Sequence, residues 1–296
     1  MSVRPLACGL FFICAVFGQA PSGPPKVVRI FRDVLKPGRS AAQEKLGINL
    51  ARAAARAKYP VNYLALNSVS GESEVWLLEA HDSFASIENA HAFVEKTPVL
   101  KWFISQYEAQ EGELVSTSRR MLAAYRQDLT YRGAQSAQDL PKMRFLSVVM
   151  LRLHPARDAE FSESVKAVTA AYETIKSDQP LVIYQVVSGV ESPTFLFLTP
   201  MASLKAMDDA ALRGKALREA LGEERAAGVL KTSAEVTASS ESLLLALNPR
   251  LSYVSKEFAS ADPDFWIPKP PPQPAPSTTP VQPSPGSPAP PAPVKP

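Results

Sequence analysis

Short segments rich in β-branched and aromatic residues recur along the chain and end at turn residues. They lie at 27–34, 61–69, 74–80 and 119–125 in the first half, and at 145–153, 181–187, 194–198 and 242–247 in the second. Residues of these types fit the pleated, half-buried surface of a sheet, so each segment is expected to be a strand. The second and third strands of each half are expected to join around Gly71 and Gly189.

Between the first and second strands of each half, the pattern is that of a helix. In the second half, apolar residues step by three or four positions, which places them on one helix face. These residues are Phe161, Val165, Val168, Tyr172 and Ile175. In the first half, Ser40 and Gln43 have the spacing of a capping box, so Ser40 is expected to cap the helix. Asp158 holds the matching cap position in the second half.

A second helix is expected between the third and fourth strands of each half. Ser83 and Ser203 precede these helices as N-cap residues, whose side chains accept hydrogen bonds from free backbone N–H groups. In the first half the helix breaks at Thr97 and restarts at Pro98, because proline suits the first helical position. The order within each half is therefore β-α-β-β-α-β, which is that of the ferredoxin-like unit.

The two halves share residues in the same order at separations that drift from 118 to 122 positions. Pro37 matches Pro155, and the tripeptide Val-Ser-Gly at 69–71 recurs at 187–189. An ordered series of such matches indicates an internal repeat. The predicted units are 25–135 and 142–258.

The element order, the unit length and the tandem copy resemble the dimeric α+β barrel superfamily, which includes antibiotic-biosynthesis-monooxygenase-like and NIPSNAP-like domains. The chain also looks similar to exported bacterial proteins with the same double unit. The resemblance covers roughly residues 27–255. It implies an α+β fold in which two tandem ferredoxin-like βαββαβ units pair their sheets into an intramolecular, pseudo-dimeric barrel.

The amino terminus has the pattern of a secretory signal peptide, which is predicted at residues 1–20. Arg4 precedes an uncharged run of twelve residues at 6–17, which is too short for a transmembrane helix of about 20 residues. Small residues permit cleavage after Gly18 or Ala20, and an uncleaved membrane anchor is the alternative. We therefore expect export to the periplasm or the extracellular medium, with no membrane span after cleavage.

The carboxyl end is predicted to be a disordered proline-rich tail at 263–296. Between 268 and 296, 14 of 29 residues are proline. Because proline lacks a backbone donor and fixes φ, neither a helix nor a sheet ladder is expected there. The residues 265–267 are expected to be the last that pack on the folded part. The tail is either a solvated terminus or a segment that docks on an envelope partner.

Charge and cysteine content narrow the function classes. The formal net charge is +3 with both signs mixed, which does not favour nucleic acid as a partner. Cys8 and Cys14 both lie in the predicted signal peptide, so no disulfide or thiolate site is expected after cleavage. The sequence has no phosphate-binding loop, nucleophile elbow or zinc motif, and we expect no metal and no cofactor.

Four residues of the first half are candidates for ligand binding: Arg29, Tyr63, Trp76 and His91. The first three lie on strands that could line an aromatic pocket with a polar group. His91 steps with the apolar residues of the second helix, so it is expected on the helix face toward the sheet. The leading interpretation is a small hydrophobic ligand in the cleft between helix and sheet, and ordinary core packing is the alternative.

The resemblance adds an enzymatic alternative. Some haem-degrading members use a histidine on this helix as axial ligand, with a tryptophan on the third strand, and the matching residues are His91 and Trp76. The second half has Ala211 where His91 would recur. Cofactor-free monooxygenase-like chemistry is the other enzymatic alternative. A third interpretation is an envelope interaction protein that acts through its proline-rich tail.

Overall fold

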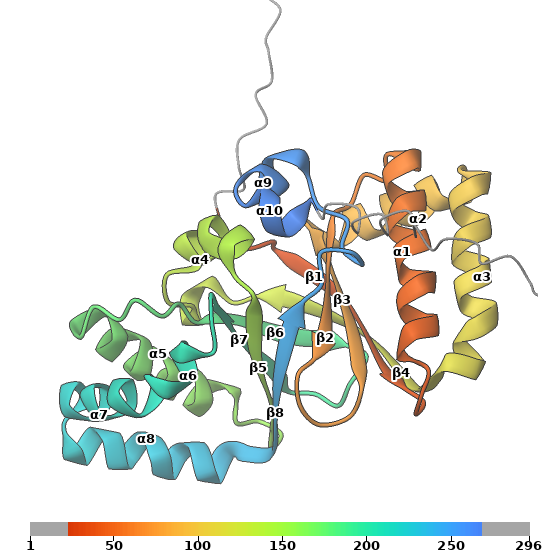
Figure 1. Cartoon of the computed structure of the whole chain (residues 1–296). Helices are drawn as coiled ribbons and strands as arrows, with labels where there is room; N and C mark the ends of the chain where they lie inside the picture. Colours follow the sequence, from red (N-terminus) through yellow and green to blue (C-terminus); the bar gives the residue numbers. More distant parts are fainter. Residues whose placement is uncertain (1–22, 268–296) are drawn as a thin grey trace, which may run out of the picture.

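Eight strands form one closed antiparallel sheet in the computed structural model, which describes residues 23–267 (Figure 1). The strands are β1 (Val27–Leu35), β2 (Tyr63–Ser68), β3 (Glu74–His81), β4 (Val115–Tyr125), β5 (Phe145–Leu153), β6 (Val182–Ser188), β7 (Thr194–Met201) and β8 (Thr237–Leu247). Their order around the barrel is β1-β3-β2-β8-β5-β7-β6-β4. The predicted α+β barrel is confirmed as a closed antiparallel sheet with helices around it.

The barrel is sealed where strands of the two halves meet. β2 pairs with β8 through Leu66 to Ser68, and β4 pairs with β6 through Leu122 to Tyr125. The ladders within each half are longer, because β1 pairs with β4, and β5 with β8, along their whole length. Closure thus pairs edges that either half alone would leave open.

Helices cover the outside of the barrel in two groups on opposite sides (Figure 1). The first group is α1 (Ser40–Ala57), α2 (Phe84–Glu95) and α3 (Pro98–Leu114), and the second is α5 (Asp158–Thr174), α6 (Lys205–Asp208), α7 (Ala210–Leu221) and α8 (Glu223–Val236). α1 packs along α3, and α5 packs against α7 and α8. Phe161 and Val165 are buried on α5, as the apolar pattern predicts.

The start of the second helix agrees with prediction only in the first half. The Ser83 hydroxyl accepts a backbone hydrogen bond from three residues further along, and α3 begins at Pro98, both as predicted. Ser203 is not a side-chain cap, which makes that prediction wrong. Leu204 already has helical backbone angles, and α6 begins at Lys205 without a side-chain cap. Ser203 therefore lies one residue too early to cap it.

The predicted capping box is also wrong. Ser40 and Asp158 are the first residues of α1 and α5 instead of their caps. The Ser40 hydroxyl shares a hydrogen bond with the Ser73 hydroxyl at 3.1 Å. Gln43 is buried and donates from Nε2 to the Tyr107 hydroxyl at 3.1 Å. Ser40 and Gln43 therefore bind residues far away in the sequence and do not form the local capping box that their spacing predicts.

The last strand of each half is longer than the sequence predicts. β4 begins at Val115 instead of 119, and β8 begins at Thr237 instead of 242. The added residues are mostly serine and threonine and are largely exposed. Their side chains do not alternate between apolar and polar, but their backbones pair with β1 and β5. Strand pairing extends these strands where side-chain pattern gives no signal.

Side chains fill the interior of the barrel, as in other small barrels. The buried interior cluster includes Val28, Ile30, Leu66, Trp76, Met121, Leu146, Val148, Met150, Tyr184, Leu196, Leu245 and Leu247. The helix-covered outer faces form separate apolar clusters, one of them between the first-half strands and α1 to α3. The sheet therefore has two buried faces. Inward side chains pack in the barrel interior, and outward side chains pack under the helices.

Two short helices close one end of the barrel. They are α9 (Lys256–Ser260) and α10 (Pro263–Trp266), which lie near α4 (Gly133–Asp139) (Figure 1). Trp266 is 5% exposed, belongs to the barrel interior cluster, and donates from Nε1 to the Pro141 carbonyl at 2.6 Å. The prediction that the disordered tail starts at 263 is therefore wrong, because the Trp266 indole both buries apolar area and finds a hydrogen-bond partner.

The predicted signal peptide at 1–20 and the tail from 268 to 296 lie outside the described residues. Within residues 23–267, no helix is both long enough and apolar enough to cross a bilayer.

Candidate functional site

The end of the barrel interior that faces away from α10 is charged. Along β1, the inward positions run from apolar residues to Arg32, which is 7% exposed. On β3, Glu74 lies in phase with the inward Trp76, and on β8, Glu241 lies in phase with the inward Leu245. Alternate residues of a strand share one face of the sheet. The inward face therefore changes from apolar to charged at this end, which we call the mouth.

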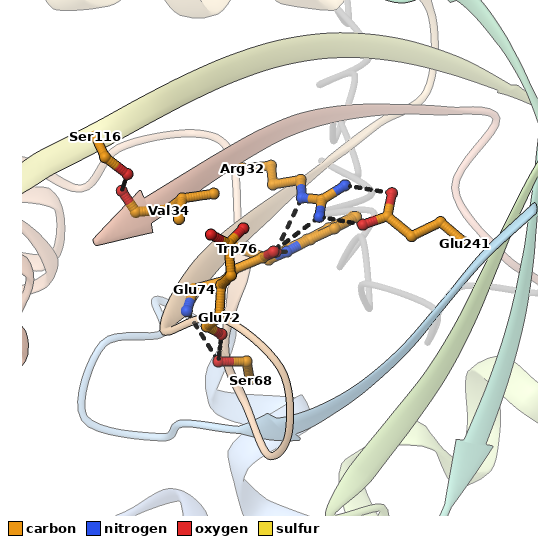
Figure 2. Close-up of polar contacts among 8 residues, drawn as sticks. All are labelled: Arg32, Val34, Ser68, Glu72, Glu74, Trp76, Ser116 and Glu241. Atoms are coloured by element: carbon orange, nitrogen blue, oxygen red, sulfur yellow. Dashed lines mark hydrogen bonds and ion pairs between the residues drawn. The ribbon is translucent and has the colours of Figure 1, made fainter. Parts of the chain in front are cut away.

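Arg32 holds two carboxylates at the mouth through four hydrogen bonds (Figure 2). Its Nε and Nη2 donate to the two oxygens of Glu74 at 2.9 and 2.7 Å. Its Nη1 and Nη2 donate to the two oxygens of Glu241 at 2.8 and 2.5 Å. Trp76 donates from its indole Nε1 to Glu74 at 2.7 Å, and its ring lies 5.1 Å from the Arg32 guanidinium carbon. A planar guanidinium suits such paired contacts with carboxylates.

The network connects the two halves of the chain, and its three charged side chains differ strongly in burial. Arg32 and Glu74 come from the first half and are buried, whereas Glu241 comes from β8 and has a side chain that is 44% exposed. Burial alone would lower the pKa of Arg32, but its hydrogen bonds to Glu241 and Glu74 outweigh this and raise that pKa. The hydrogen bonds from Arg32 lower the pKa of Glu241. Arg32 and Glu241 are therefore both charged at neutral pH.

Two serine hydroxyls fix the backbone around this network (Figure 2). The Ser68 hydroxyl accepts from the Glu74 N–H at 2.8 Å and donates to the Glu72 carbonyl at 2.7 Å. The Ser116 hydroxyl donates to the Val34 carbonyl at 3.1 Å. These contacts hold the start of β3 and the start of β4 in place, so the charged groups stand on rigid strands.

A half-open hollow of about 500 Å³ lies at the mouth. Its charged lining comes from Arg119 on β4, Arg152 on β5, Glu191 in the β6–β7 turn, and Glu241 on β8. Arg152 forms an ion pair with Glu191 and donates from Nε to the Ser239 hydroxyl at 3.2 Å. Clefts of about 300–1,000 Å³ are typical of small-molecule sites, so the hollow is large enough for a small polar ligand.

A second polar cluster lies between the sheet and the first helix group. Arg29 donates from Nε to Glu79 at 2.6 Å, and the Tyr59 hydroxyl and His81 Nε2 each lie 3.4 Å from that carboxylate. His81 Nδ1 also lies 3.0 Å from the Ser86 hydroxyl. Burial would raise the pKa of Glu79, but its hydrogen bonds with His81 and Arg29 lower it.

The structure does not bring the four predicted site residues into one place. Arg29 belongs to the second polar cluster, and Tyr63 packs among the residues under α1 to α3. Trp76 lies on the opposite face of the sheet, inside the barrel. The Tyr63 hydroxyl is buried and has no hydrogen-bond partner among the described residues. A role in ligand binding stays a prediction for each of these residues.

His91 is exposed, so its predicted placement on the buried face of α2 is wrong. Ala90 is the buried residue of this helix, and Phe93 and Val94 pack against the same cluster. The predicted stripe included Phe84, but this side chain is 48% exposed at the helix start. The buried face is therefore rotated from the one that apolar spacing indicates, and His91 points away from it.

His91 and Trp76 do not fit the haem arrangement that the resemblance implies. One side chain is exposed on α2, and the other is enclosed in the barrel, with the sheet between them. Within residues 23–267, no group of three or more His, Cys, Asp or Glu side chains is arranged to hold a metal ion.

The residues of the mouth are largely those that sequence reasoning missed. Arg32 is noticeable in the sequence only as a charge on the first strand, and Glu241 precedes the predicted last strand. The signal that could have found Arg32 is its phase, since it follows Val28 and Ile30 at alternate positions. The Arg32–Glu241 pair has no local signal, because 209 positions separate its members.

Comparisons with known proteins give similarity to solved structures alone. No protein-family model matches the chain, and no curated protein matches it either. A Fusobacterium nucleatum structure assigned as a monooxygenase is similar over 76% of this chain and 93% of its own, with 10% identity and a TM-score of 0.49. An anthrone oxidase-like protein is similar over 78% and 95%, with 13% identity and a TM-score of 0.49. A chlorite dismutase variant of Candidatus Nitrospira defluvii is similar over 80% and 95%, with 8% identity and a TM-score of 0.45.

Proposed function

We propose that this protein binds a small molecule at the mouth of its barrel. The observation that carries the proposal is the hollow of about 500 Å³, lined by charged and hydroxyl side chains at the one barrel end that α9 and α10 leave uncovered. The Arg32 network forms its rigid floor, since Glu241 both lines the hollow and accepts two hydrogen bonds from Arg32.

The mouth replaces the cleft between helix and sheet as the proposed binding place. In the first half, that cleft is filled by Tyr59, Tyr63, Ala90 and Leu100, which pack together between the strands and the helices. The lining of the mouth is polar, with Met150 and Val190 as its apolar members. The proposed ligand is therefore a molecule with an apolar part and polar groups, in place of a purely hydrophobic one.

We also propose that the barrel is a pseudo-dimer of two tandem ferredoxin-like units. The support is the order β4-β1-β3-β2 in the first half, which recurs as β8-β5-β7-β6 in the second. The Val-Ser-Gly tripeptide of the repeat precedes the third strand in both halves. In this arrangement the mouth lies where the two units meet, so each unit supplies part of the site.

A variant that fills the hollow tests the binding function. Ser239→Trp places an indole in the hollow, and Ser242→Trp is the matched control, because Ser242 is exposed on the same strand outside the hollow. Native mass spectrometry of each protein, purified from envelope extracts, should show a bound small molecule in the wild type and in Ser242→Trp only. An absence of bound mass in the wild type, or its retention in Ser239→Trp, would contradict the proposal.

A second candidate function is monooxygenase-like chemistry between the sheet and the first helix group, which requires the packed side chains there to move apart when substrate binds. The observation that favours it is the buried Tyr63 hydroxyl, which lacks a hydrogen-bond partner within residues 23–267 and belongs to the helix-covered cluster with Tyr59. Oxygen uptake by the wild type with hydroquinone substrates, reduced in Tyr63→Phe, would support this candidate. A wild type that consumes no oxygen with these substrates would remove it.

We further propose that the protein is exported to the periplasm or beyond, on the basis of residues 1–20 alone. Fractionation of cells that express the full chain should place it outside the cytoplasm. Replacing the apolar run at 6–17 with polar residues should retain it inside, and equal distribution of both proteins would overturn the proposal. Deletion of 268–296 tests the alternative that the protein interacts with the envelope through its tail. That alternative predicts that the shortened protein keeps its fold but changes its location.

A further inference from the structure

The charges at the mouth are balanced in number but not in their contacts. Three arginines (Arg32, Arg119 and Arg152) face three glutamates (Glu74, Glu191 and Glu241). Arg32 is bound by Glu74 and Glu241, and Arg152 is bound by Glu191. Arg119 forms no hydrogen bond or ion pair within the part of the chain that the structure describes, and it is exposed to the hollow.

The position of Arg119 makes this lack of a partner costly. Arg119 on β4 lies directly opposite Arg32 on β1 in the strand register. Side chains at opposite positions have Cβ atoms about 4.5–5.5 Å apart, and like charges there destabilise the sheet. Glu241 compensates in part, since it interacts electrostatically with Arg119 as well as with Arg32. An anion beside Arg119 would supply the hydrogen-bonded partner that its guanidinium lacks among the described residues.

We propose that the mouth recognises the carboxylate of a small organic monoanion through the guanidinium of Arg119. This inference rests on the proposed binding function of the mouth and names the chemical class of its ligand. The flat guanidinium fork matches a carboxylate or a phosphate with two parallel hydrogen bonds. A monoanion is preferred to a dianion, because the six charged residues of the mouth already sum to zero and the second negative charge would face Glu191 and Glu241.

The rest of the hollow suits the body of such a ligand. Met150 and Val190 supply an apolar surface, and the Ser239 hydroxyl on β8 lies beside Arg152, from whose Nε it accepts a hydrogen bond. The Glu191 side chain that pairs with Arg152 is 74% exposed, so this ion pair contributes little and can open at small cost. Arg152 is therefore available as a second cation once a ligand is present.

Thermal unfolding with matched probes tests the inference. The probes are benzoate and hexanoate, their uncharged amides benzamide and hexanamide, and phenyl phosphate as the dianion. The proteins are the wild type, Arg119→Gln, and the control Arg120→Gln. Arg120 is the next residue along β4 but is already bound to Ser118 and Glu111 away from the hollow.

The two carboxylates should raise the melting temperature of the wild type and of Arg120→Gln, and their amides should not. Arg119→Gln should weaken carboxylate binding about ten- to hundred-fold, as expected for a lost hydrogen-bonded ion pair. The inference is overturned if neither carboxylate binds, if Arg119→Gln binds them as well as the wild type, or if phenyl phosphate binds more tightly than benzoate. If the amides bind, and Ser239→Trp but not Arg119→Gln abolishes this, the binding function stands and the carboxylate inference fails.

Discussion

At the scale of the residue, Glu74 is the most constrained group of the mouth. Its side chain is 3% exposed and accepts three hydrogen bonds, two from Arg32 and one from the Trp76 indole. A buried carboxylate is tolerated only when its desolvation is compensated by such contacts. Removal of Arg32 or of the Trp76 indole would therefore leave the buried Glu74 carboxylate without full compensation.

Replacing Glu74 with glutamine should destabilise the protein by about 3 kcal/mol, the lower end for removing one partner of a buried ion pair. The matched control is Glu241→Gln, whose side chain is 44% exposed, so its cost should stay within about 1 kcal/mol. Urea unfolding at neutral pH measures both changes. Equal losses of stability would show that burial of the Arg32–Glu74 pair does not increase its contribution to the free energy of unfolding.

Stability should fall at acidic pH through Glu79, because folding lowers the pKa of this carboxyl below its ordinary value of 4.5. A lowered pKa contributes stability that is complete above pH 4.5 and is lost as the pH falls through the folded value. The wild type should therefore exceed Glu79→Gln at pH 7 by an amount that shrinks steadily below pH 4.5. Chemical unfolding at a series of pH values checks this, and a constant difference would contradict it.

At the scale of the element, two turn glycines at matching positions of the repeat have different surroundings. Gly71 joins β2 to β3 with φ of 81°, and a Cβ added there would meet no atom within 4 Å. Gly189 joins β6 to β7 with φ of 102°, and a Cβ there would lie 2.0 Å from the Arg120 carbonyl oxygen. The β6–β7 turn therefore lies directly against β4, whereas its counterpart stands free.

Alanine substitutions at the two glycines should separate backbone strain from steric conflict. Gly71→Ala should cost about 1–2 kcal/mol, the cost of a left-handed backbone for a residue with Cβ. Gly189→Ala should cost about 1–3 kcal/mol more, because the added methyl group also displaces β4. Comparison of their urea midpoints measures the difference. Similar midpoints would mean that the β6–β7 turn moves away from β4 without cost.

The elements were more predictable from the sequence than the site. Local patterns sufficed for all eight strands and for the apolar face of Phe161 and Val165, because burial on a sheet or helix face leaves a period in the sequence. The same patterns misplaced His91 on α2, since the helix is covered on one flank by α3. The contact between Arg32 and Glu241 at the mouth could not be predicted, because 209 positions separate the two residues.

At the scale of the whole molecule, the two halves share one interior. Trp76 of the first half and Leu196 of the second belong to the same buried cluster, and the seams β2–β8 and β4–β6 join the halves by backbone hydrogen bonds. Neither half could separate without exposing the inward face of its strands. The barrel is therefore a single unit of stability.

Unfolding should occur in one cooperative step despite the length of the chain. Tryptophan fluorescence reports on Trp76 in the barrel, Trp266 in its closed end and the exposed Trp102 on α3. Far-UV circular dichroism reports on all helices and strands. The two signals should follow the same urea curve, as a two-state transition requires. Two separate midpoints would show that one half keeps its structure while the other unfolds.

The place of β8 in the barrel sets a condition on how the protein is made. Among the strands within residues 23–267, this one is the last to be synthesised, and it lies between β2 and β5, which are made long before it. Until β8 pairs with them, both of those strands keep an open edge of unpaired backbone groups. A chain that stops before β8 would offer two such edges to other nascent chains, and open edges of this kind promote aggregation. Pairing of β8 with β2 and β5 therefore covers both open edges and prevents association between incomplete chains.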